Sequence, residues 1–279
     1  MKKMQALGAP FEIQYSSNSN LKPKEFNWVS EDFPVKVFID SAISAGMSYQ
    51  KKPGEKKIAW VCESRAIFHS MSFPRDLWEQ NFIQICSSYD LMFTSEKSWI
   101  GKYPNVKYCP AGSNLPWIKN QNIFPKSKLV SMIASPKKFA FGHALRHSLA
   151  DRFYESVDLY GGVRGSKRLS PGIPWGDKSE GLNDYMFSIT IENDKYETYY
   201  TEKLTDCFST GTIPIYWGSP DIGEIFNKNG IIELTPDFDP KMLTRELYES
   251  KLDAVKDNFN RVQDLISADD QLYKLINEN

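Results

Sequence analysis

Residues 187–220 read FSITIENDKYETYYTEKLTDCFSTGTIPIYWGSP, and this stretch decides the fold class. Its first five residues alternate apolar and hydroxyl side chains, which is the period-two pattern of a β-strand. Residues 201–209 have the pattern of a short helix that stops at Gly211, and residues 213–217 form a second apolar strand. A strand, a helix and another strand in this order predict a parallel β-α-β unit.

Further short apolar runs lie on either side of this stretch, separated by segments of helical period. The clearest helix spans residues 141–154, where Leu145, Leu149 and Phe153 share one face. The first 55 residues are polar, and we predict loops at residues 16–20 and 51–54 there. Other strands are predicted at residues 58–62, 91–94, 106–109, 129–133 and 157–160.

Strands and helices alternate in both halves of the chain, which predicts an α/β protein with two parallel sheets covered on both faces. Residues 116–128 are rich in Pro, Asn and Lys and form the expected hinge. We therefore expect two domains, residues 1–125 and residues 126–279, with a cleft between them. An amphipathic tail helix at about 249–277 is expected to pack against one domain or back on the N-terminal one.

The composition excludes several classes of protein. The 279 residues include 34 basic and 35 acidic ones, so no polycationic surface indicates a nucleic-acid partner. No run of 18 apolar residues predicts a membrane segment, and the first ten residues lack the apolar core of a secretory signal. Four cysteines without metal-site spacing, and no Asn-x-Ser/Thr sequence, indicate a cytoplasmic protein. The sequence leaves the oligomeric state open.

The residues best suited to bind a ligand lie between the first strand of the opening stretch and the first turn of its helix. Glu192 and Asn193 follow the strand, and Tyr199, Glu202 and Lys203 begin the helix. A helix N-terminus offers unpaired N–H groups and a positive dipole end, which suit a phosphate. Lys203 is unfavourable in a first helical turn unless a negative group lies nearby. This predicts a nucleoside diphosphate site, and the alternative is a solvated lysine beside a glutamate that stabilises the helix dipole.

Residues 187–204, Asp206 and residues 211–220 resemble the C-terminal signature of the α-1,3/1,4-fucosyltransferases, glycosyltransferase family 10. That signature has a strand ending in Phe-Glu-Asn, a loop, Tyr-x-Thr-Glu-Lys-Leu, a helix and Pro-Ile-Tyr-Trp-Gly. The resemblance implies the GT-B architecture of two Rossmann-like domains facing across a cleft, with GDP-fucose held by the second domain. The sequence departs from the pattern at Ile191, in place of the phenylalanine, and at Thr198, in place of a glycine.

The resemblance also implies roles for individual residues. Glu202 would bind hydroxyl groups of the ribose or the sugar, and Lys203 would bind the diphosphate. Arg146 is the best counterpart of a second phosphate-binding residue of the family, and Arg164 is a weaker candidate. The remaining donor-binding candidates are Asn193 and Tyr199.

Glu63 follows the predicted strand at 58–62 and matches the position of the family's catalytic base. Such a base removes the proton from the acceptor hydroxyl and contributes about 10²–10⁴-fold in rate. The alternative is an exposed glutamate or a partner for Arg65. The donor motifs contain no Asp-x-Asp pair, and Arg146 and Lys203 can neutralise the leaving diphosphate, so we expect no cofactor and no required divalent metal.

The sequence thus predicts an inverting glycosyltransferase that moves L-fucose from GDP-fucose to a hydroxyl of a glycan, with α-1,3 linkage to GlcNAc or Glc. Residues 1–125 would bind the acceptor and residues 126–279 the donor. Two alternatives remain. One is an enzyme of the same fold that uses another nucleotide sugar, which the Thr198 loop permits, and the other is a catalytically silent glycan-binding protein.

Overall fold

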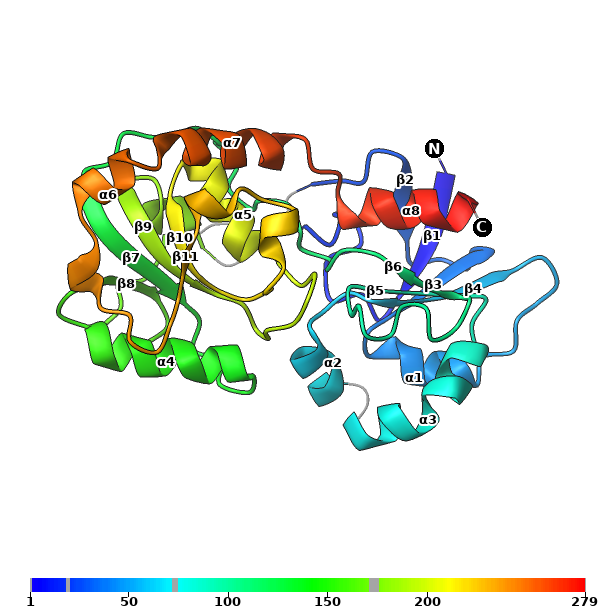
Figure 1. Ribbon diagram of the computed structural model, residues 1–279. Helices are drawn as coiled ribbons and strands as arrows, with labels where there is room; N and C mark the ends of the chain where they lie inside the picture. Colours follow the sequence, from blue (N-terminus) through cyan, green and yellow to red (C-terminus); the bar gives the residue numbers. More distant parts are fainter. Residues whose placement is uncertain (1, 19–20, 72–74, 171–175, 279) are drawn as a thin grey trace. The chain divides into compact units, whose positions relative to one another are not determined.

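The computed structural model describes residues 2–18, 21–71, 75–170 and 176–278, and its internal contacts divide the chain into two compact units (Figure 1). Unit 1 comprises Met1–Asn114 and Ile266–Asn279, and unit 2 comprises Leu115–Leu265. The division falls earlier than the expected one at 125/126, and the end of the chain returns to unit 1. Within the described ranges, no helix has the length and apolar character needed to cross a membrane.

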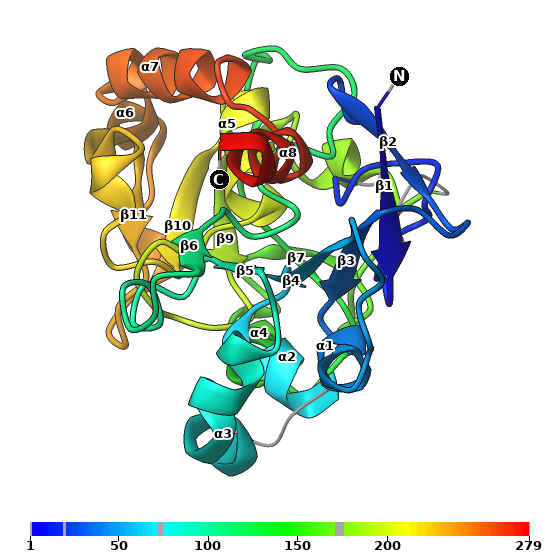
Figure 2. The same cartoon turned by 90° about the vertical axis from the view of Figure 1, so that its right-hand side faces the viewer.

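Unit 1 is built on a six-stranded parallel sheet with the order β2-β1-β3-β4-β5-β6. Helix α8 packs on one face of this sheet, and α1, α2 and α3 lie on the other (Figure 1 and Figure 2). The strands are β1 (Lys2–Leu7), β2 (Phe26–Val29), β3 (Val35–Ile39), β4 (Lys56–Val61), β5 (Leu91–Thr94) and β6 (Val106–Tyr108). The helices are α1 (Ala42–Met47), α2 (Arg65–Met71), α3 (Arg75–Ser87) and α8 (Ala268–Glu278).

The loop predicted at residues 51–54 is confirmed. No strand was predicted in the first 55 residues, yet this segment contains β1, β2 and β3. Lys36 shows the physical reason. It lies in β3 and is only 2% exposed, yet its Nζ donates to Gln5 Oε1 at 2.8 Å and lies 3.4 Å from Glu55 Oε1. Because the protein supplies these partners, a polar sequence occupies the interior of a sheet.

Unit 2 has a five-stranded parallel sheet with the order β11-β10-β9-β7-β8, and every residue of β9 is buried. Helix α4 covers one face, while α5 and α7 cover the other (Figure 1). The strands are β7 (Lys128–Ala134), β8 (Asp158–Gly161), β9 (Tyr185–Ile191), β10 (Ile213–Trp217) and β11 (Ile232–Glu233). The helices are α4 (Phe141–Phe153), α5 (Glu202–Thr210), α6 (Arg245–Glu249), α7 (Leu252–Gln263), and the short 3₁₀ turns η1 (Lys178–Gly181), η2 (Ile222–Glu224), η3 (Lys228–Gly230) and η4 (Pro240–Met242).

The tail is not one helix over 249–277, because α7 and α8 are separate elements. Ser267 begins α8 with a reciprocal cap: its hydroxyl donates to Asp270 Oδ2 at 2.8 Å and accepts the Asp270 N–H at 3.1 Å. The buried Asp269 accepts the Trp28 indole N–H at 2.7 Å. These contacts, together with its apolar face, attach α8 to the unit 1 sheet.

Candidate functional site

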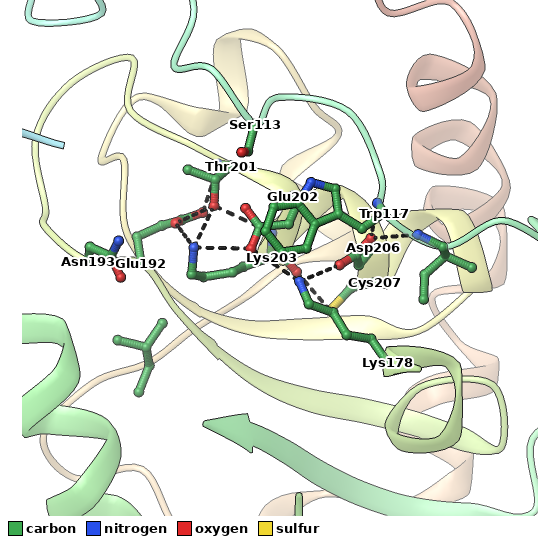
Figure 3. Close-up of polar contacts among 12 residues, drawn as sticks. Ser113, Trp117, Lys178, Glu192, Asn193, Thr201, Glu202, Lys203, Asp206 and Cys207 are labelled. Atoms are coloured by element: carbon green, nitrogen blue, oxygen red, sulfur yellow. Dashed lines mark hydrogen bonds and ion pairs between the residues drawn. The ribbon is translucent and has the colours of Figure 1, made fainter. Parts of the chain in front are cut away.

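Asn193, Glu202 and Lys203, three of the candidate residues, lie at the carboxyl end of β9 (Figure 3). Glu192 follows the strand and is fully buried. Its Oε1 accepts the Thr201 N–H at 2.9 Å and its Oε2 accepts the Thr201 hydroxyl at 2.7 Å. Thr201 is also the N-cap of α5. Glu192 therefore fixes the start of α5 to the end of β9, where ligands of open α/β sheets bind.

Lys203 lies in the first turn of α5 with its ammonium among oxygen atoms. The Nζ lies 3.3 Å from Glu202 Oε1 and 3.6 Å from Glu192 Oε2, and it donates to Thr201 Oγ1 at 3.0 Å. The protein itself thus supplies the negative groups that a lysine requires at this end of a helix. The side chain of Lys203 is 24% exposed.

Lys178 of η1 extends the cluster, and the sequence analysis missed it. Its Nζ lies 3.1 Å from Glu202 Oε1, 2.9 Å from Asp206 Oδ2 and 4.2 Å from the centre of the Trp117 ring (Figure 3). Burial alone would lower the pKa of Lys178, but the attraction of Asp206 and Glu202 outweighs it and raises the pKa. Lys178 is therefore a cation at neutral pH.

Glu202 experiences the opposite balance. Burial alone would raise its pKa, but the charges of Lys178 and Lys203 outweigh burial and lower the pKa to about 2. Glu202 is therefore a carboxylate at neutral pH and accepts hydrogen bonds only.

Arg146 comes from α4 and is 5% exposed. Its Nε donates to the Ile191 carbonyl at 3.0 Å, and its Nη2 donates to Ile191 O at 2.6 Å and to Asn193 Oδ1 at 2.9 Å. Burial lowers the pKa of Arg146, against the opposing charges of Glu192 and Glu202. The remaining nitrogen, Nη1, makes no hydrogen bond to the part of the chain that the structure describes, so it can serve a ligand.

Gly142 allows α4 to approach β9 closely. A Cβ atom at this position would lie 1.8 Å from the carbonyl oxygen of Glu192, which no side chain tolerates. The N–H of Gly142 donates to the Asn193 carbonyl at 3.2 Å. The glycine thus brings the helix that carries Arg146 to the end of β9.

The loop between β9 and α5 contains Thr198, the departure from the family pattern. Thr198 has a φ of +63°, in the left-handed region that favours glycine. Its N–H donates to Asp221 Oδ1 at 2.7 Å, which stabilises this conformation. The loop therefore adopts at Thr198 a backbone geometry that suits the glycine of the family.

The structure brings together four of the candidates, Arg146, Asn193, Glu202 and Lys203. Tyr199 is 1% exposed, and its ring stacks on Tyr196 with 4.8 Å between the ring centres. Arg164 lies apart, because it is exposed and follows β8, which is separated from β9 by β7.

Glu63 lies in unit 1, directly beyond β4, where its strand position predicted it. Its backbone N–H donates to Asp40 Oδ1 at 3.2 Å, and the N–H of Cys62 donates to the same oxygen at 2.9 Å. Arg65, considered as a partner for Glu63, has its Nη1 3.1 Å from Glu96 Oε2. The sequence analysis missed Asp40, which only the pairing of β3 with β4 places beside Glu63.

In residues 2–18, 21–71, 75–170 and 176–278, no three His, Cys, Asp or Glu side chains are placed to hold a metal ion together. Outside the donor motifs the chain has an Asp-x-Asp sequence at residues 237–239. The side chain of Asp239 accepts the Lys241 N–H at 3.0 Å and caps η4. The dispensability of a metal stays a prediction.

Comparisons with known proteins concern chiefly unit 2. Residues 124–262 match the family model described as Glycosyltransferase family 10 (fucosyltransferase) C-term. An 88-residue alignment is 34% identical to Alpha-(1,3)-fucosyltransferase FucT of Helicobacter pylori and covers 31% of this chain and 18% of that protein. A 91-residue alignment is 33% identical to GDP-fucose protein O-fucosyltransferase 3 of Bos taurus and covers 30% of this chain and 19% of that protein. The matches thus span about a fifth of these curated relatives.

The fold comparison extends over both units. A crystal structure of an alpha1,3-fucosyltransferase aligns with a TM-score of 0.52 at 14% identity, covering 93% of this chain and 81% of that one. This neighbour has the GT-B architecture. The predicted fold class, GT-B with two Rossmann-like α/β units, is therefore confirmed.

Proposed function

We propose, from the premise that residues 124–262 of this chain belong to glycosyltransferase family 10, that the protein is an inverting fucosyltransferase using GDP-fucose. The observation that carries this proposal is the cluster at the end of β9, where Arg146, Lys203 and the N-terminus of α5 converge. The names of the two relatives support GDP-fucose as the donor: one is an alpha-(1,3)-fucosyltransferase, and the other is a GDP-fucose protein O-fucosyltransferase.

The diphosphate of the donor would bind to Arg146 and Lys203. Lys178 and Lys203 each lie near two carboxylates, but the side chain of Lys203 is the more exposed, 24% against 13%. We therefore assign the anion to Lys203 and to Nη1 of Arg146, which makes no hydrogen bond with the described residues. The first N–H groups of α5 add donors on the same side. Glu202, ionised and fixed by Lys178, would accept hydrogen bonds from hydroxyl groups of the ribose or the fucose.

The proposed transfer step uses one residue of unit 1 and two of unit 2. An acceptor hydroxyl oxygen attacks the anomeric carbon of fucose, the bond from that carbon to the β-phosphate oxygen breaks, and GDP leaves. Glu63 takes the proton of the hydroxyl, and attack opposite the leaving group inverts the anomeric carbon. Arg146 and Lys203 stabilise the negative charge that develops on GDP, each charged hydrogen bond contributing about 1.5–3 kcal/mol.

For the acceptor, we propose a glycan bound by unit 1 and an α-1,3 linkage to GlcNAc or Glc. The α-1,3-fucosyltransferase relative from Helicobacter pylori supports this choice. A protein acceptor is the second candidate, because the bovine relative is named a protein O-fucosyltransferase. Another nucleotide sugar is less well supported, since Thr198 adopts the left-handed conformation that suits the family's glycine.

A donor screen tests the proposed function. Calorimetry compares GDP, GTP, UDP and ADP, and transfer assays compare GDP-fucose, GDP-mannose and UDP-GlcNAc on GlcNAc-containing and lactose-type acceptors, with and without EDTA. We expect GDP to bind most tightly and only fucose to be transferred, with equal rates in EDTA. Transfer from UDP-GlcNAc would contradict the donor, and loss of activity in EDTA would contradict the metal-free mechanism.

Lys203→Ala tests the diphosphate site. We expect GDP to bind about 10- to 100-fold more weakly, because one charged hydrogen bond contributes about 1.5–3 kcal/mol. Lys195→Ala is the matched control, since this lysine lies in the preceding loop, is exposed and has its Nζ 3.9 Å from Glu233 Oε1. Calorimetry gives both dissociation constants, and equal affinities would remove Lys203 from the phosphate site.

A further inference from the structure

Asp40 is a buried carboxyl group that the transfer step does not use. It follows β3, is 0% exposed and has a φ of +42°, a left-handed conformation that costs a non-glycine residue free energy. Its Oδ1 accepts the N–H groups of Cys62 and Glu63. Its Oδ2 is buried and makes no hydrogen bond with any residue that the structure describes. A buried carboxylate oxygen without a partner is costly, whereas a protonated one is less so.

The charges around Asp40 favour its protonated form. Burial and, to a smaller extent, the negative charge of Glu63 raise the pKa of Asp40 to about 8, against the opposing effect of the two backbone hydrogen bonds. The neighbouring Cys62 thiol is buried, and its pKa is raised well above the usual value, so it stays neutral. Burial, the nearby Glu63 and the unpartnered Oδ2 therefore all favour a proton on Asp40.

We propose that Asp40 is a positioning residue for Glu63: it holds the backbone of Glu63 at the end of β4 and keeps the negative charge of the pair on Glu63 by retaining its own proton. The positioning role rests on the proposed function of Glu63 as the base. The second part, that the Asp40–Glu63 pair keeps one proton and that this proton is on Asp40, does not depend on that function; we call it proton sharing. The two N–H groups bonded to Oδ1 belong to Glu63 and the residue before it, so Asp40 fixes the point from which the Glu63 side chain extends.

Proton sharing is tested by measuring how the stability of unit 1 depends on pH, so the test needs no enzymatic assay. Hydrogen exchange of β3 and β4 peptides is measured from pH 5 to pH 8 and corrected for intrinsic exchange. A folded-state pKa above the unfolded value means that the folded protein binds the proton more tightly, so the contribution of Asp40 to stability falls as pH rises. In the Asp40→Asn variant, this decrease in stability with rising pH should disappear. In the Glu63→Gln variant, it should be smaller than in wild type. A Glu63→Gln profile identical to wild type would overturn the proton sharing.

The positioning role is tested by rescue. Asparagine keeps the Oδ1 acceptor, whereas valine removes it, so we expect kcat within about threefold of wild type for Asp40→Asn and at least about tenfold lower for Asp40→Val. The KM for GDP-fucose should stay unchanged in both, and exchange of β4 confirms that unit 1 is folded. Equal kcat values for the two variants would overturn the positioning role. Absence of fucose transfer in wild type would contradict the proposed function, while the stability profiles would still decide the proton sharing.

Discussion

Replacing Glu63 with glutamine is expected to lower the rate of fucose transfer by about 10²–10⁴-fold, because the amide cannot take the proton of the attacking hydroxyl. The substitution keeps the size of the side chain and the backbone hydrogen bond to Asp40. Donor binding depends on residues of unit 2, so the affinity for GDP should stay the same. Steady-state kinetics with saturating GDP-fucose and calorimetry with GDP measure the two quantities separately.

Glu31→Gln is the control, because Glu31 is an exposed glutamate of unit 1 whose Oε1 pairs with Lys3 Nζ at 3.1 Å. It should leave both kcat and GDP affinity unaltered. Turnover of the Glu63→Gln variant at the wild-type rate would dismiss Glu63 as the base. A parallel loss of GDP affinity would instead indicate a defect beyond proton transfer.

Lys178→Met is expected to destabilise unit 2 by about 3–5 kcal/mol, because removing one partner of a buried ionic group leaves uncompensated charge. The lysine is 13% exposed and neutralises Glu202 and Asp206. The acid sensitivity should also change. Glu202 has a folded pKa of about 2 and an ordinary value of 4.5, so the stability it contributes is present above pH 4.5 and is lost as pH falls toward 2. Without Lys178 this loss begins at higher pH.

Urea unfolding of unit 2, followed by hydrogen exchange of β9 and α5 peptides, measures this effect at pH 7 and pH 4. Lys128→Met is the matched control, since Lys128 Nζ pairs with Asp184 Oδ2 at 3.3 Å with both side chains largely exposed. Exposed pairs contribute about 0–1 kcal/mol, so this variant should lose little. Equal losses in the two variants would show that Lys178 has no special role in the cluster.

Much of the fold of unit 2 follows from local pattern. The alternation before Glu192 predicted β9, the apolar run at 213–217 predicted β10, and Gly211 marked the end of α5, where it has a φ of +72°. Unit 1 was harder, because Lys36 makes the buried strand β3 read as polar. Gln5 and Glu55, two partners of its ammonium, come from other segments, so only the tertiary structure shows how the charge is compensated.

The residues of the candidate site likewise fall into those that the sequence indicated and those that only the structure shows. Strand ends and helix starts carry a local signal, which indicated Glu63, Glu202 and Lys203 from the sequence. Lys178 is 24 residues from Glu202 and lies in a short turn, and Asp40 meets Glu63 through strand pairing. Such contacts depend on chain topology rather than on spacing, so no periodic pattern could reveal them.

The return of α8 to unit 1 has a consequence for biosynthesis. As the ribosome extends the chain, residues 115–265 emerge in full before the segment that completes the first sheet. The residues of unit 1 that precede unit 2 therefore lack part of the cover of Phe26 and Trp28 until Leu272 and Tyr273 have been made, after residues 115–265. Nascent domains ordinarily mature from the N-terminus onward, but here the later-encoded one can mature first.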